Sequence, residues 1–144
     1  CHALALISKR FLNGETLDPS EPTTATKLVT LYKKAGVNAF LVLDSIHAYE
    51  TFGMSLQDCL SQIGSMPIGL LHLSGPGHRG ATSREYHHDY NLCLEHNQKL
   101  SENRLRVTLE GPVRGITQSS DKHLGKVARL VSELTGEKVV ISEK

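Results

Sequence analysis

Histidine and carboxylate side chains are concentrated in the middle of this sequence, in a pattern that indicates metal chemistry. Asp44 and His47 stand three positions apart, and five of the eight histidines lie between residues 47 and 88. Zinc, manganese and iron are bound in catalytic sites by such mixtures of imidazole nitrogen and carboxylate oxygen. A rim salt bridge or a hydrogen-bonded core histidine would explain any one of these residues by itself. Their combination favours a metal site.

Short apolar runs alternate with amphipathic segments along the chain. The predicted strands cover residues 2–8, 38–44, 67–73, 104–110 and 138–142. The predicted helices cover residues 23–35, 55–63, 89–103 and 119–135. Apolar strands that alternate with helices predict parallel pairing, with helices packed on the sheet. We therefore predict one α/β domain over residues 1–144, built from parallel (β/α) units.

The candidate site residues fall at the carboxyl ends of three successive predicted strands. Asp44 ends the second strand, His72 lies near the end of the third, and Glu110 ends the fourth. In parallel α/β sheets the working residues gather at this edge, whatever the reaction. The segment after the third strand is predicted to be a loop and contributes His78, Arg79, Arg84, Glu85, His87, His88 and Asp89. The sequence thus predicts one rim rich in histidine and acids.

Composition narrows the classes of partner. The formal net charge of the 144 residues is +1, which gives no global electrostatic footprint for nucleic acid, although a local site could still hold a few phosphates. No apolar run approaches the roughly 20 residues of a membrane helix, so no membrane partner is predicted. Three scattered cysteines without a CxxC motif favour a reducing, intracellular setting. The start at Cys1, just before an apolar run, fits a processed product, a piece of a longer chain or a domain cut close to its edge.

Four stretches of the sequence resemble one known family in order and spacing. They are "LVLDSIHAYETFGMS", "LLHLSGPGHRG", "TSREYHHDY" and "RVTLEGP". They are similar to the Asp-x-x-His, "HLND", "GSR-x-DRH" and "LETP" motifs of the type-IV apurinic/apyrimidinic endonucleases and their xylose-isomerase-like TIM-barrel relatives. The resemblance spans about residues 38–112 and implies the C-terminal half of a TIM barrel.

The resemblance also implies a set of roles. It implies metal ligands at Asp44, His47, His72, Glu85, His87 and Glu110, with zinc or manganese as the cofactor. His72 and Glu110 would be catalytic, and Arg84 and Arg79 would contact phosphate. The activity it implies is metal-dependent cleavage of DNA on the 5′ side of abasic sites.

Some features of the chain depart from the family and leave alternatives open. The family's Asp in the third motif is Glu85 here, and its first four strands have no counterpart in this sequence. We therefore expect another protein chain, or a preceding half of the barrel, to complete the sheet. One alternative is a degenerate barrel fragment that acts as a structural or interaction subunit. Another is a sugar isomerase or epimerase that uses one metal ion.

Overall fold

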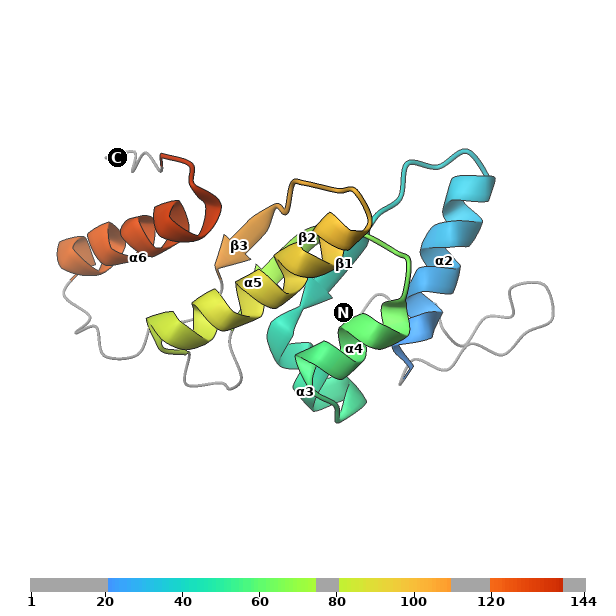
Figure 1. Cartoon of the computed structure of the whole chain (residues 1–144), viewed down its shortest axis with the longest axis horizontal. Helices are drawn as coiled ribbons and strands as arrows, with labels where there is room; N and C mark the ends of the chain where they lie inside the picture. The colour runs from blue at the N-terminus through green and yellow to red at the C-terminus, as the bar shows by residue number, and fades with distance from the viewer. Residues whose placement is uncertain (1–20, 75–80, 110–119, 139–144) are drawn as a thin grey trace.

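Helices and strands alternate along the chain. The computed structural model describes residues 21–74, 81–109 and 120–138. Its elements, in chain order, are α2 (Pro22–Lys34), β1 (Leu41–Asp44), α3 (Ser45–Phe52), α4 (Leu56–Ile63), β2 (Ile68–Leu73), α5 (Ser83–Lys99), β3 (Val107–Leu109) and α6 (Ser120–Thr135) (Figure 1). The three described strands form a sheet in the order β1-β2-β3, and both pairings are parallel. The predicted mixed α/β class with parallel strands is therefore confirmed.

Several predicted elements agree closely with the structure. The helices predicted over 23–35, 55–63 and 119–135 and the strand predicted over 67–73 each agree with an observed element to within about one residue at each end. The strands predicted over 38–44 and 104–110 are shorter, because β1 begins at Leu41 and β3 contains only Val107–Leu109. The strand predicted over 2–8, and that over 138–142 apart from Lys138, lie outside the described residues.

The predicted start of the third helix, at residue 89, is wrong. Helix α5 begins at Ser83, so residues 84–88 lie on its first turns and not on a loop. The cause is a capping box, in which the Glu85 N–H donates to Thr82 Oγ1 and the Thr82 N–H donates to the Glu85 carboxylate. These two bonds satisfy N–H groups that would otherwise be unpaired at the helix start.

Helix α3 was not predicted at all. Its first turn is stabilised by Asp44, whose Oδ1 accepts hydrogen bonds from the N–H groups of Ile46 and His47. It ends at Gly53, which adopts φ 62°, a left-handed conformation that costs glycine little. The Asp-x-x-His segment is therefore the start of a helix that follows β1 without a loop.

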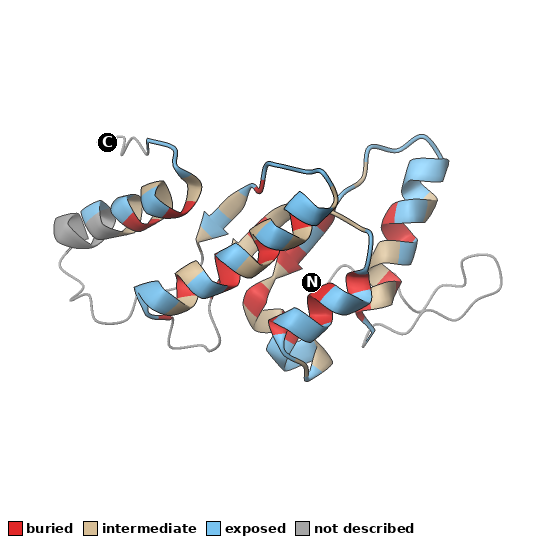
Figure 2. Cartoon of the chain, in the orientation of Figure 1, coloured by how far each residue is buried: buried red, intermediate tan, exposed pale blue. Residues whose placement is uncertain are grey.

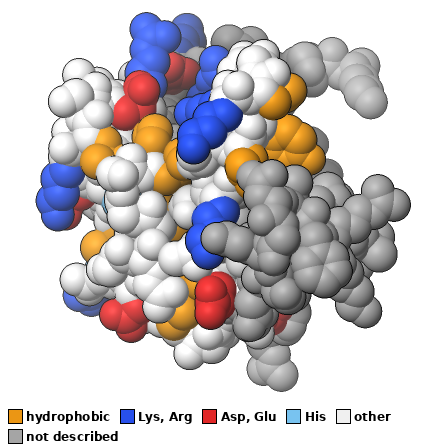
Figure 3. Space-filling view, turned by 90° about the vertical axis from the view of Figure 1, so that its right-hand side faces the viewer, with side chains coloured by type: hydrophobic (Ala, Val, Ile, Leu, Met, Phe, Trp, Pro, Cys, Tyr) orange, Lys and Arg blue, Asp and Glu red, His pale blue; other side chains and the backbone are white. Residues whose placement is uncertain are grey.

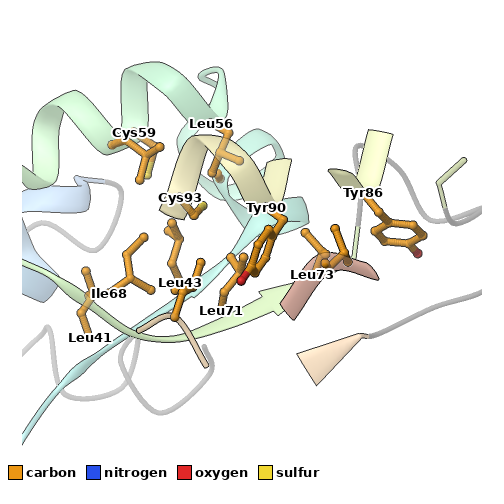
Figure 4. Packing of buried hydrophobic residues seen from close by; sticks show 14 of the residues in the cluster. Leu41, Leu43, Leu56, Cys59, Ile68, Leu71, Leu73, Tyr86, Tyr90 and Cys93 are labelled. Atoms are coloured by element: carbon orange, nitrogen blue, oxygen red, sulfur yellow. The ribbon is translucent and has the colours of Figure 1, made fainter. Parts of the chain in front are cut away.

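One face of the sheet is covered by helices α4 and α5. Leu43 and Leu71 are partners in the β1–β2 register, and both are buried. Apolar side chains from the two helices pack over the strands (Figure 4), and those labelled there are Leu56, Cys59, Tyr86, Tyr90 and Cys93. The buried positions follow one side of each helix (Figure 2). Removal of this apolar surface from water is the main term that holds the layers together.

Residues that alternate with this core point to the opposite face of the sheet. The register places Asp44 beside His72 and His72 beside Thr108. Because partners in register point to the same side of a pleated sheet, these three side chains share a face. Val42 on that face is 44% exposed, and Thr108 is also exposed. Within the described ranges, this face is the less covered one, and it carries two of the predicted site residues.

The far end of α5 is fixed to β2 by a buried amide. Asn97 Oδ1 accepts from the Ile68 N–H at 2.8 Å, and Asn97 Nδ2 donates to the carbonyls of Ile68 and Arg104. His96 Nε2 lies 2.9 Å from the carbonyl oxygen of Met66, beside the same strand start. These contacts anchor α5 along β2 and thereby set where its N-terminal turns lie.

Candidate functional site

Asp44 is the centre of a small group of polar side chains at the carboxyl end of β1. Its Oδ2 lies 3.9 Å from His47 Nε2 and 3.9 Å from His72 Nδ1. The Asp44 side chain is only 10% exposed, whereas the two imidazoles are 40% and 31% exposed. One oxygen of Asp44 caps α3, and the other faces both histidines. We call Asp44, His47 and His72 the rim cluster.

Local backbone geometry explains why these three residues meet. His72 is the register partner of Asp44 on the neighbouring strand, so the two side chains emerge side by side. His47 lies in the first turn of α3, and the cap formed by Asp44 holds its N–H 3.3 Å from Asp44 Oδ1. The sheet and the helix start thus bring the three side chains together.

A buried hydrogen bond connects the two strand ends beside the rim cluster. The Ser74 N–H donates to Ser45 Oγ at 2.9 Å, and both residues are buried. Ser45 directly follows Asp44, and Ser74 comes two residues after His72. A hydrogen bond in a buried setting is stronger and more restrictive than an exposed one, so it limits movement of β1 relative to β2 at the site.

Glu50 joins the group from the next turn of α3. Its Oε2 lies 3.9 Å from His47 Nδ1, so the two nitrogens of this imidazole face different carboxylates. The sequence analysis did not select Glu50. Its i,i+3 spacing from His47 would have indicated the contact, but only once residues 45–52 were recognised as a helix.

The structure places other predicted ligands elsewhere. The Glu85 carboxylate takes part in the capping box of α5, and His87 Nε2 lies 3.7 Å from Glu133 Oε2 of α6. Arg84 is exposed on the first turn of α5. Glu110 and Arg79 lie outside the described residues, so their predicted roles stay predictions.

Asp89 is a buried acid on α5. It is 3% exposed, and its Oδ2 has no hydrogen-bond partner among the described residues. Burial raises its pKa to about 6; the nearby Glu85 adds to this rise, and His88 opposes it. The sequence analysis grouped Asp89 with the loop acids, whereas the helix turns it toward the core, together with Tyr86, Tyr90 and Cys93.

The donor types of the rim cluster fit a zinc or manganese ion. One carboxylate oxygen and two imidazole nitrogens are the mixture that such ions take in catalytic sites. Tetrahedral ligands at bonds of about 2.0 Å stand roughly 3.3 Å apart, so the 3.9 Å pairs would need to close by about half an ångström. In the part of the chain that the structure describes, no group of three or more His, Cys, Asp or Glu side chains is yet arranged to hold a metal ion.

The charge distribution, the helix lengths and the cysteines of the described residues bear on the kind of partner this protein can have. On the face that looks toward α2, basic, acidic and hydrophobic side chains are interspersed (Figure 3). A single basic track for a nucleic-acid backbone is not seen on the described part of that face. Among the described helices, none has the length and apolar character to cross a lipid bilayer. The two cysteines in the described ranges, Cys59 and Cys93, are buried and free.

Comparison of the chain with protein-family models, with curated proteins and with solved structures gives no match.

Proposed function

We propose that this chain carries the metal site of a phosphodiesterase that resembles the type-IV abasic-site endonucleases. Asp44, His47 and His72 would hold a zinc or manganese ion, and Glu110 from the end of the next strand would complete the set. The observation that carries this proposal is the position of Asp44 Oδ2, 3.9 Å from an imidazole nitrogen of each histidine.

Asp44 and His72 have separate tasks in this proposal. A bound divalent ion would supply Lewis-acid stabilisation of phosphate charge and a water of lowered pKa. Asp44 contributes negative charge through Oδ2 while its Oδ1 stays on the helix cap, so its orientation is fixed by the backbone. His72 is held by β2, the central strand of the described sheet. Ligands on rigid elements keep their geometry better than ligands on loops.

The proposed architecture is part of a (β/α) barrel. In such a barrel the helices cover the outside of the sheet, and the site lies at the carboxyl ends of the strands. The helix-covered face with Leu43 and Leu71 would be the outside, and the face with Asp44, His72 and Thr108 would be the interior. A second chain, or a preceding half, would supply the remaining strands. The proposed substrate is DNA that contains an abasic site.

The first experiment is a measurement of metal content by mass spectrometry on protein purified without a chelator. Wild type, Asp44→Asn and His72→Ala are compared with His88→Ala, which removes an exposed histidine of α5. We expect zinc or manganese in wild type and His88→Ala, and a loss of at least tenfold in the other two. Equal metal content in all four proteins would contradict the assignment of Asp44 and His72.

Cleavage is tested next, on a labelled DNA duplex with one abasic-site analogue. We expect a cut on the 5′ side of the analogue in the presence of zinc or manganese, and none with His72→Ala. If wild type binds the metal but leaves this duplex intact, the nuclease part of the proposal is refuted, whereas the proposed metal site stands.

A catalytically degenerate barrel fragment is the second candidate, and one observation favours it. Glu85 and His87, two of the six ligands that the resemblance implies, are engaged in a helix cap and in a contact with Glu133. This candidate predicts a wild-type protein that takes up no zinc or manganese even when either ion is added in excess. The metal measurement therefore separates the two candidates.

A further inference from the structure

One edge of β1 is open to a further strand. β1 is the first strand in the order β1-β2-β3, so within the described ranges only its β2 side pairs with another strand. Leu41 and Leu43 are nevertheless buried, as in a strand from the interior of a sheet, whereas Phe40 and Val42, which alternate with them, are exposed. An apolar strand with an open row of N–H and C=O groups is a ready template for another strand.

The position of helix α2 shows on which side such a strand belongs. α2 contacts both β1 and α4, which places it on the face of the sheet that α4 and α5 cover (Figure 1). The crossovers from β1 through α4 to β2, and from β2 through α5 to β3, advance across this face in one direction. Crossovers between parallel strands are right-handed in nearly all proteins, so those that use the same face advance the same way. A strand that leads into β1 through α2 therefore lies on the side of β1 away from β2.

Residues 2–8 precede α2 in the chain and have the pattern of a strand. They read HALALIS, an apolar run of strand length that lies outside the described residues, and residues 9–21 connect them to α2. On α2, Leu28 and Val29 are buried, although neither belongs to the apolar cluster that the described residues form over the sheet. Because a crossover helix packs on both of the strands that it joins, these two side chains fit a contact with a strand beside β1.

We propose that residues 2–8 of this chain dock as a parallel strand along the open edge of β1, beneath α2. Leu4 and Leu6 share one face of such a strand and would pack against α2, since alternate side chains point to the same side. The occupant is this segment and not a second copy of the chain, because residues 9–21 tether it close to β1 and give it a high effective concentration there. This docking does not depend on the proposed function, and it moves the open edge of the sheet from β1 to residues 2–8.

The first test is NMR on the full chain, by nuclear Overhauser effects between backbone protons. We expect contacts between residues 2–8 and residues 41–44 in the pattern of parallel strands. A second sample mixes isotope-labelled with unlabelled chains, and an isotope filter then selects contacts between two molecules, of which we expect none from residues 2–8. Contacts to β1 in that filtered experiment would assign the edge to a second copy and overturn the proposal. The absence of contacts between residues 2–8 and β1 from both samples would overturn it as well.

Amide hydrogen exchange then measures how well the segment protects β1. Leu6→Asp places a charge on the face that would pack against α2, so we expect the β1 amides directed away from β2 to exchange at least about tenfold faster. The Leu71 N–H, which donates to the Arg106 carbonyl, reports on the rest of the sheet and should keep its rate. Thr16→Asp, which adds the same charge to the connecting segment, is the matched control and should change neither rate. Equal exchange of the β1 amides in Leu6→Asp and Thr16→Asp would overturn the proposal.

Discussion

Asp44 and His72 are register partners on neighbouring parallel strands, and Asp44 Oδ2 lies 3.9 Å from His72 Nδ1. The pairing of β1 with β2 fixes this relationship, so it does not depend on loop conformation. The same aspartate also starts α3, and it therefore has a structural role as well as a proposed chemical one. Substitutions that keep one role and remove the other can separate them.

Asp44→Asn should keep the role of this side chain as the cap of α3 and remove its negative charge. An asparagine can still accept the N–H groups of Ile46 and His47, so we expect a free energy of unfolding within about 0.5 kcal/mol of wild type. Asp44→Ala removes the acceptor and should cost about 1 kcal/mol. Both variants should lose metal binding. Urea unfolding beside a zinc titration checks this, and an Asn variant as unstable as the Ala variant would contradict the capping role.

Glu85→Gln tests whether this residue serves only the start of α5. Glutamine also completes a capping box, so we expect stability within about 0.5 kcal/mol of wild type and unchanged zinc affinity. Glu85→Ala should lose about 1 kcal/mol, again with zinc affinity unchanged. If Glu85→Gln were as stable as wild type but bound zinc tenfold more weakly, Glu85 would belong to the metal ligands after all.

Because of Asp89, the protein should be more stable in mild acid, where this side chain is protonated, than at neutral pH, where it is charged. Its pKa is raised from 3.8 to about 6, so the folded state binds the proton more tightly than the unfolded state does. The stability from this proton is fully present below about pH 4 and is lost as the pH rises through 6. Asp89→Asn should therefore raise the free energy of unfolding at pH 7, on the order of 1–2 kcal/mol.

The measurement is urea unfolding of both proteins at several pH values from 4 to 8. The difference between Asp89→Asn and wild type should grow between pH 4 and 6 and then level off. A difference that does not change with pH would show that Asp89 is not buried as an acid.

Asn97→Ala should be among the most destabilising single changes in α5. It leaves the N–H of Ile68 and the carbonyls of Ile68 and Arg104 without the partner that they have in the structure. A buried group that loses its partner costs about 1–3 kcal/mol, and three groups are affected, so we expect a total of at least about 3 kcal/mol. Gln98→Ala, at the exposed neighbouring position, should change stability by less than about 0.5 kcal/mol. Thermal and urea unfolding compare the two variants.

Gly69→Ala should destabilise β2 by a steric clash with Phe40. A Cβ at this position would lie 2.6–2.8 Å from three atoms of the Phe40 side chain, one of which is its Cβ. We expect a cost of about 1–3 kcal/mol, since one atom in conflict lies close to the backbone. In a double-mutant cycle, Phe40→Ala should remove part of this cost. Additive effects of the two changes would argue against the contact.

Local signals in the sequence were sufficient to predict several elements. A helix was predicted over 55–63, and the Oγ of Ser55 at its start accepts from the Asp58 N–H, as an N-cap residue does. The strand at 67–73 is an apolar run of the right length and is observed as β2. The starts of α3 and α5 were missed because Asp44 and Glu85 were not recognised as residues that satisfy the backbone of a helix start.

By itself, the sequence determined the alternation of strands and helices, the parallel α/β class and the approach of Asp44, His47 and His72 at the strand ends. Apolar periodicity, caps and the rule that parallel strands end at one edge are all local or nearly local properties. Only the tertiary structure decided that His87 faces Glu133 and that Asp89 is buried. Both depend on the rotation of α5 about its axis, and the packing of whole helix faces against the sheet and against α6 sets that rotation.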